Sequence, residues 1–219
     1  MKKPAGFAVK TALALLMLVI VGAVTYLSPW TFALLVWVVW AMFHREMAAL
    51  ATSTGRITDR LQLEQWIVWS GLIVAIVIRF ISLRWTLAIG LTAIAADIGA
   101  NVVGLLLGKK LIKREFSAYS PTKSWEGAAG GFIFGTLTFA AIMSGQSVPG
   151  GMAGILVIGA VASVAAILGD LRQSHMKREY HIKDTASTLP GHGGMSERLD
   201  SVCTTFIVVP LVVIMLICV

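Results

Sequence analysis

The segment VCTTFIVVPLVVIMLICV (202–219) decides the fold, because it contains no charged residue. About 18 to 20 consecutive apolar residues are enough to cross a bilayer as a helix. Six apolar runs precede it, at 11–27, 30–43, 66–81, 85–107, 128–143 and 152–168. The sequence therefore predicts an all-α polytopic integral membrane protein with about seven transmembrane helices. The second and fifth runs are short, so one of them could be re-entrant or tilted, and the second could continue a little beyond 43.

The composition supports this class of protein. The chain has 219 residues, of which 57% are hydrophobic and 13% are charged. Soluble domains are usually about 45–50% apolar and about 25% charged. We expect a single transmembrane domain over 1–219. The N-terminal apolar run is longer than the core of a signal peptide, and we expect it to be the first membrane helix.

The distribution of positive charge predicts the orientation. If the N-terminus is cytoplasmic, 16 of the 18 lysine and arginine residues fall on the inner side, and only Arg79 and Arg84 fall outside. This bias follows the positive-inside rule. It predicts a cytoplasmic N-terminus, an external C-terminus and cytoplasmic polar loops at 108–127 and 170–201. The basic residues form no continuous stripe, which argues against a nucleic-acid partner.

Polar residues inside the fourth run point to a cavity. Asp97 and Asn101 lie one helical turn apart, and a carboxylate in an apolar span is costly unless it is paired or faces water. One explanation is an interhelical hydrogen bond at a crossing of small residues. The other is a polar active-site cavity that opens toward the cytoplasm.

The end of the sixth run carries a second polar group. Asp170, Ser174 and Lys177 have the spacing i, i+4, i+7, so they share one face if the helix continues beyond the membrane. A solvated helix end would explain the same residues without any function.

The loop KDTASTLPGHGGMSERLD (183–200) adds glycines and acids. Its glycines allow backbone N–H groups to converge on an anion. Glu197, Asp200 and Ser201 follow at helical spacing and offer the oxygen ligands that suit Mg²⁺. A flexible loop with incidental charges is the alternative. The loop at 108–131 contributes Lys123, which either meets a phosphate or maintains topology.

Together these patterns favour phosphoryl or nucleotidyl transfer to a lipid. The stretch SHMKREYHIKDTASTLPGHGGMSERLD (174–200) closely resembles the signature of the phosphatidate cytidylyltransferases, also called CDP-diacylglycerol synthases. The motifs GDL (169–171), SPTKSWEG (120–127) and DIGA (97–100) resemble the same family. The resemblance covers roughly 97–200, so we expect the catalytic region at about 97–201.

The resemblance implies a reaction of CTP with phosphatidate that gives CDP-diacylglycerol and pyrophosphate. It implies Mg²⁺ as cofactor, with room for a second cation. The implied roles are catalytic for Lys177, Asp184, His192 and Arg198; substrate-binding for Ser120, Lys123, Ser174, Arg178, Lys183, Gly193 and Gly194; metal-binding for Asp170, Glu197 and Asp200; and cavity-lining for Asp97 and Asn101. The expected surroundings are membrane lipids in a bacterial inner membrane, with a homodimer as one arrangement.

Two departures from the family pattern leave alternatives open. Glu197 stands where the family has aspartate, and the chain is short for the family, so we expect a divergent paralogue. One alternative function is a CTP-dependent lipid kinase of the polyprenol type. The other is a catalytically weak paralogue that acts as a lipid-binding or partner subunit.

Overall fold

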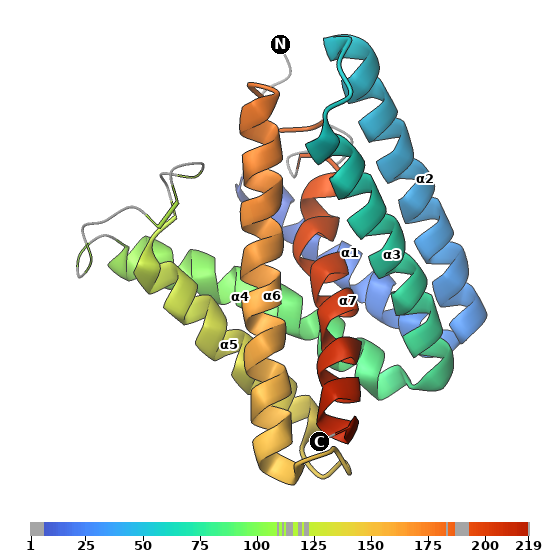
Figure 1. Ribbon diagram of the computed structural model, residues 1–219, viewed down its shortest axis with the longest axis vertical. Coiled ribbons are helices and arrows are strands. Elements are labelled where there is room, and N and C mark those ends of the chain that lie inside the picture. The colour runs from blue at the N-terminus through green and yellow to red at the C-terminus, as the bar shows by residue number, and fades with distance from the viewer. Residues whose placement is uncertain are drawn as a thin grey trace.

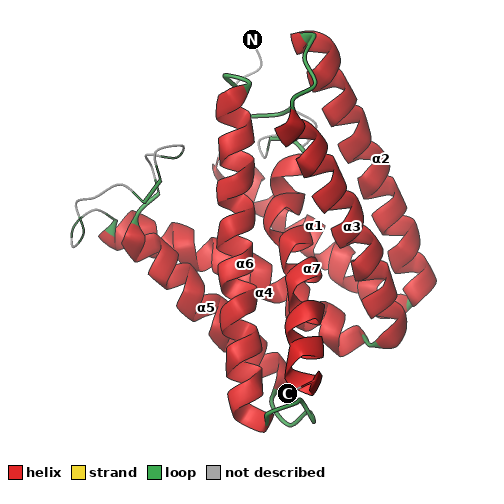
Figure 2. Cartoon of the chain, in the orientation of Figure 1, coloured by secondary structure: helices red, strands yellow, loops and turns green. Residues whose placement is uncertain are grey.

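The computed structural model describes residues 7–108, 110, 112, 116–117, 120, 123–182, 184–186 and 193–218, with side chains from residue 16 onward. This part of the chain forms helices and contains no β-strand (Figures 1 and 2). The helices are α1 (Phe7–Leu27), α2 (Pro29–Thr54), α3 (Asp59–Ile81), α4 (Leu83–Leu107), α5 (Trp125–Met143), α6 (Gly151–Glu179) and α7 (Ser196–Cys218).

The prediction of an all-α polytopic membrane protein is confirmed. Within the described residues, six helices are long and apolar enough to span a bilayer, and the described side chains of α1 add a shorter apolar stretch, Leu16–Leu27. Large apolar side chains such as Leu105 and Ile81 are exposed on the outside of the bundle. In an integral membrane protein these side chains face lipid.

The second span does continue beyond Phe43, and it extends further than the sequence indicated. Helix α2 has 26 residues, begins with Pro29 after an N-cap at Ser28, and ends at Gly55 in the left-handed conformation. The charged stretch around Arg45 does not end the helix, because Arg45 is exposed while Glu46 lies on the buried face. Helix α3 also begins earlier than expected, at Asp59, where the Thr58 side chain caps it.

Helix α6 is the longest element and extends past a single bilayer thickness. Its 29 residues correspond to about 44 Å of helix, against a hydrocarbon core of about 30 Å. The helix continues through Glu179, so the condition for a shared face of Asp170, Ser174 and Lys177 is met. Figure 1 shows the C-terminal end of α6 at the same end of the bundle as the α2–α3 connection.

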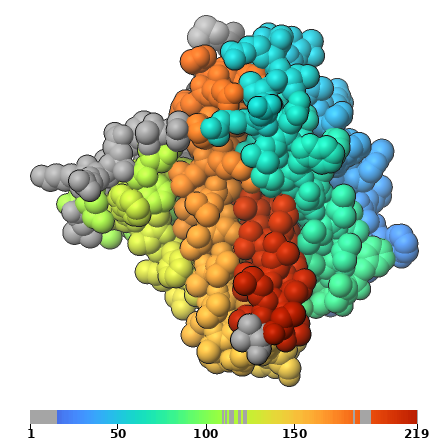
Figure 3. Space-filling view, viewed as in Figure 1, coloured from blue at the N-terminus to red at the C-terminus, as the bar shows by residue number. Residues whose placement is uncertain are grey.

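One pair of helices has its own orientation within the bundle. Helices α4 and α5 pack extensively against each other and lie obliquely to the others (Figure 1). The larger core joins α2, α3, α6 and α7 through side chains such as Phe43, Leu61 and Phe206, and it also includes Ile89 of α4 and Phe139 of α5. The space-filling view shows α6 and α7 side by side, with α3 next to α7 (Figure 3).

Glycines bring α4 and α5 close together. A Cβ atom at Gly131 would lie 2.7 Å from the carbonyl oxygen of Ala96, and one at Gly99 would lie 2.9 Å from the carbonyl oxygen of Gly130. These are main-chain atoms that cannot move without separating the helices. The crossing of small residues therefore exists, and it lies between α4 and α5.

Candidate active site

The face of α6 formed by Asp170, Ser174 and Lys177 receives a lysine from the segment before α5. The Nζ atom of Lys123 lies 2.5 Å from Oδ2 of Asp170 and donates a hydrogen bond of 3.4 Å to Oγ of Ser174. Ser124, the next residue, caps α5. The start of α5 is thereby fixed next to α6, and two residues from separate predicted motifs meet.

Three carboxylates from three helices approach one another. Asp97 on α4, Asp170 on α6 and Asp200 on α7 interact electrostatically with each other. The Ser201 hydroxyl donates a hydrogen bond of 3.2 Å to Oδ1 of Asp97, and the Ser201 N–H donates one of 2.7 Å to Oδ1 of Asp200. Like charges in a partly buried place repel, so this cluster favours binding of a cation.

A glycine allows α6 and α7 to approach at this cluster. A Cβ atom at Gly169 would lie 2.5 Å from the carbonyl oxygen of Asp200 and 2.7 Å from Oγ1 of Thr204. A larger residue would push the two helices apart and separate Asp170 from Asp200. The glycine of the GDL motif thus has a packing role.

Glu197 binds the protein's own loop. Its Oε1 accepts the N–H of Thr185 at 3.0 Å, and its Oε2 accepts the N–H of Gly194 at 2.5 Å. The Lys177 ammonium group lies 3.4 Å from Oε1. Both oxygens therefore serve as acceptors for backbone N–H groups in this arrangement.

The glycine pair of the loop fits tightly between side chains. Gly193 has φ +79°, and a Cβ atom there would collide with Oε2 of Glu197. A Cβ atom at Gly194 would lie 2.6 Å from Oγ1 of Thr185 and 2.8 Å from Oε2 of Glu46. The anions that this loop meets in the structure are the two glutamates; a role in binding substrate phosphate stays a prediction.

The other predicted site residues differ in their relation to the carboxylate cluster, and the exposed Arg198 interacts electrostatically with Asp97. Asn101 is exposed on α4 and makes no hydrogen bond with a described residue, whereas Asp97 accepts a hydrogen bond from Ser201 of α7. Asp184, Arg178 and Arg198 have exposed side chains, and Ser120 is buried in the loop before α5. Lys183 and His192 lie outside the described residues.

Two buried glutamates near the site were missed by the sequence analysis. Glu46 on α2 accepts N–H groups from the start of α7, and Glu64 on α3 pairs with Arg172 of α6 at 2.7 Å. The Arg172 Nη1 also donates to Oγ1 of Thr204 at 2.9 Å. These contacts fix α6 and α7 next to Asp170 and Asp200.

The sequence did contain a signal for both glutamates. Glu46 follows Phe43 by three residues and precedes Leu50 by four, and Glu64 has the same relation to Leu61 and Val68. This spacing places each acid on the apolar stripe of its helix. A carboxylate on a buried stripe needs a partner, which the structure supplies.

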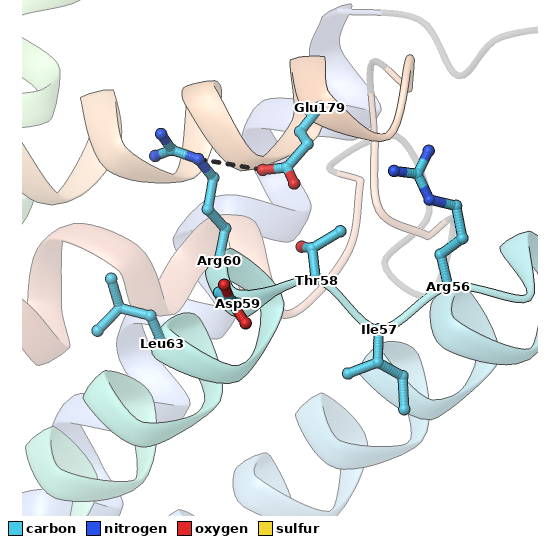
Figure 4. Close-up of a pocket in the computed structure, with 7 residues that line it drawn as sticks. All are labelled: Arg56, Ile57, Thr58, Asp59, Arg60, Leu63 and Glu179. Carbon is cyan, nitrogen blue, oxygen red and sulfur yellow. Dashed lines mark ion pairs between the residues drawn. The ribbon is translucent and has the colours of Figure 1, made fainter.

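An open pocket of about 700 Å³ lies elsewhere, between the α2–α3 connection and the end of α6 (Figure 4). Its lining residues are Arg56, Ile57, Thr58, Asp59, Arg60, Leu63 and Glu179. Arg60 pairs with Glu179 at 3.1 Å, and the two acids of the lining balance its two arginines. Glu179 is about 200° around α6 from Lys177, so this pocket faces away from the catalytic candidates.

The chemistry of the donor set fits a hard divalent cation only in part. Asp170 and Asp200 offer carboxylate oxygens of the kind that Mg²⁺ prefers. Glu197 accepts one backbone N–H on each of its two oxygens, and its role as a metal ligand stays a prediction. Within the described residues, no three His, Cys, Asp or Glu side chains converge closely enough to enclose a metal by themselves. A cation would thus need further ligands from a bound phosphate group.

Comparisons with known proteins agree with the region of the site. A sequence profile of the cytidylyltransferase family matches residues 66–216. That range includes the three carboxylates, Lys123, Lys177 and Glu197 and leaves out α1 and α2.

Curated relatives match over a similar part of the chain. A phosphatidate cytidylyltransferase from Mycobacterium bovis is 37% identical over 123 residues, which is 54% of this chain and 37% of the relative. One from Helicobacter pylori is 36% identical over 121 residues, or 55% and 42% of the two chains. One from Bacillus subtilis is 38% identical over 107 residues, or 49% and 39%. The match spans well under half the length of these relatives.

Proposed function

Because the chain belongs to the cytidylyltransferase family, we propose that it transfers a cytidylyl group from CTP to phosphatidate, which gives CDP-diacylglycerol and pyrophosphate. The relatives named as phosphatidate cytidylyltransferases support this choice of substrates. The observation that carries the proposal is the meeting of Asp170 and Asp200 with Lys123 and Lys177.

The residues of the cluster suit a reaction between two anions. An oxygen of the phosphatidate phosphate forms a bond to the α-phosphorus of CTP, and the bond from that phosphorus to the bridging oxygen of the β-phosphate breaks. Pyrophosphate leaves with the bonding electron pair. The phosphate nucleophile needs no proton removed at neutral pH, so the protein mainly orients the reactants and offsets their charge. Lys123 and Lys177 hold phosphate oxygens in this proposal.

Mg²⁺ is the proposed cofactor, held by Asp170 and Asp200 together with the triphosphate. When bound, it supplies neutralisation of the negative charge on the triphosphate and on the leaving pyrophosphate. Asp97 adds negative charge close to both aspartates and so favours retention of the cation. Glu197 is assigned to the loop and not to the metal, which changes the role expected from the family pattern.

The test is a product analysis with purified protein in lipid nanodiscs. Protein, phosphatidate, CTP and Mg²⁺ are incubated, and lipids and nucleotides are identified by mass. CDP-diacylglycerol and pyrophosphate in equal amounts support the proposal, and the Asp170→Asn variant should lose at least about 100-fold in rate. CDP with a lipid monophosphate would identify a kinase. A folded protein that forms no product with Mg²⁺ or Mn²⁺ would overturn the proposal.

We also propose that the site faces the cytoplasm of a bacterial inner membrane, where CTP is available. The excess of lysine and arginine in the loops at the site end of the bundle supports this orientation. A C-terminal alkaline phosphatase fusion should be active, since the C-terminus is proposed to lie outside. The expected homodimer is checked by the mass of the purified protein in nanodiscs.

A further inference from the structure

Glu46 is a buried carboxylate on α2, outside the range matched by the family profile. Its side chain belongs to the apolar stripe that includes Phe43, Met47 and Leu50, and the residue is only 5% exposed. No lysine or arginine among the described residues forms an ion pair with it. A buried carboxylate without a cationic partner is costly unless hydrogen bonds satisfy its oxygens.

The hydrogen bonds come from the start of α7. Oε1 of Glu46 accepts the N–H of Met195 at 2.7 Å, and Oε2 accepts the N–H of Ser196 at 3.1 Å. The first N–H groups of a helix have no acceptor within that helix, and its N-terminus favours negative charge. Glu46 therefore caps α7 from another helix, about 150 residues away in the sequence.

Glu46 and Glu197 hold adjacent residues of one short segment. Glu197 accepts the N–H of Gly194, and Glu46 accepts the next two N–H groups along the chain. A Cβ atom at Gly194 would lie 2.8 Å from Oε2 of Glu46, so the contact is close on this side as well. Three successive backbone donors are thus committed to the two glutamates.

We infer that Glu46 is a positioning residue, which fixes the Gly194–Ser196 segment and thereby the placement of Lys177, Glu197 and Asp200 for the reaction. The inference rests on the proposed function. Glu46 touches no reacting group in this account; it acts through the segment that it holds. Helix α2 consequently takes part in the active site although the family profile does not include it.

The first test is hydrogen–deuterium exchange in nanodiscs, followed by mass spectrometry of peptides covering residues 193–200. In the Glu46→Gln variant, an amide NH₂ faces one of the two N–H donors, so one hydrogen bond is lost. We expect the amides of Met195 and Ser196 to exchange at least about tenfold faster than in the wild type, with central α6 unchanged. The matched control is Arg45→Gln, at the exposed neighbouring position, which should leave exchange unaltered.

The second test separates positioning from a merely structural role. In Glu46→Gln, kcat should fall about tenfold while KM for phosphatidate stays within about twofold, because Glu46 does not contact the lipid. Glu46→Asp keeps the charge and should retain more activity than Glu46→Gln. If Glu46→Gln does not fold, Glu46→Asp is measured in the same two ways, with smaller changes in the same direction.

Unchanged exchange at Met195 and Ser196 would overturn the inference, and so would faster exchange with an unchanged kcat. The exchange measurement needs no turnover. An inactive wild-type protein would therefore count against the proposed function, while the exchange result would still support or overturn the role of Glu46.

Discussion

The ammonium group of Lys123 lies 2.5 Å from Oδ2 of Asp170, so the residue before the N-cap of α5 is tied directly to α6. Both side chains are partly exposed, at 25% and 42%. The pair is therefore accessible to solutes, and its contribution to stability is small. Its importance lies in where it holds a positive charge, next to a carboxylate proposed to bind Mg²⁺.

Replacing Lys123 should separate activity from stability. We expect Lys123→Met to lower the rate of CDP-diacylglycerol formation about 10- to 100-fold, because one charge that faces phosphate is lost. The half-saturating Mg²⁺ concentration should fall, because the lysine no longer competes for Asp170. Rates are measured over a Mg²⁺ titration, with the exposed Lys110→Met in the same loop as control. Full activity in Lys123→Met would contradict the assignment.

The buried pair of Glu64 and Arg172 should matter for stability. Arg172→Met leaves the Glu64 carboxylate, with a side chain only 5% exposed, without its cation, and we expect a loss of about 3 kcal/mol in the free energy of unfolding. The double variant Glu64→Gln with Arg172→Met should recover much of that loss. Unfolding in mixed micelles measures all three proteins. Strictly additive effects of the two substitutions would show that the pair is not coupled.

The α4–α5 crossing predicts opposite effects of two glycine substitutions. Gly131→Ala places a methyl group against the main chain of α4, and we expect a loss of about 1–3 kcal/mol in unfolding free energy. Gly90 also lies on α4, but a Cβ atom there has no neighbour within 4 Å. Gly90→Ala should therefore leave the unfolding free energy unchanged or raise it by about 0.5–1 kcal/mol. The same unfolding assay compares them. Equal effects would mean that the helices do not cross at Gly131.

The fold was predictable to the extent that apolar runs reveal membrane spans. The described residues of all seven runs lie within helices, but the sequence placed the end of α2 and the starts of α3 and α7 several residues too close to the apolar centre. Helices continue beyond the hydrocarbon core, where polar residues are favourable. Hydropathy therefore marks the end of the apolar segment and not the end of the helix. Caps such as Thr58 give a better estimate of where a helix begins.

The site was predictable where its residues share one helix. The spacing of Asp170, Ser174 and Lys177 gives their common face directly from helical periodicity. Contacts between distant segments, such as Ser201 with Asp97, depend on how helices cross, which local patterns do not determine. The same holds for Glu46, whose buried position is visible in the sequence but whose partners on α7 are not.

Shortening Glu197 should reduce activity, because its length is matched to the loop that it holds. The carboxylate of an aspartate would sit about 1.5 Å back, too far to accept both the Thr185 and the Gly194 N–H groups at their present positions. We expect Glu197→Asp to lower kcat about tenfold, since hydrogen bonds to a charged acceptor contribute about 1.5–3 kcal/mol each. The control is Glu179→Asp, which makes the same change in a glutamate that pairs with Arg60 on another face of α6. This substitution should leave kcat unaltered. A large gain of activity in Glu197→Asp would instead indicate a decayed metal ligand, and the catalytically weak paralogue would become the better account of this chain.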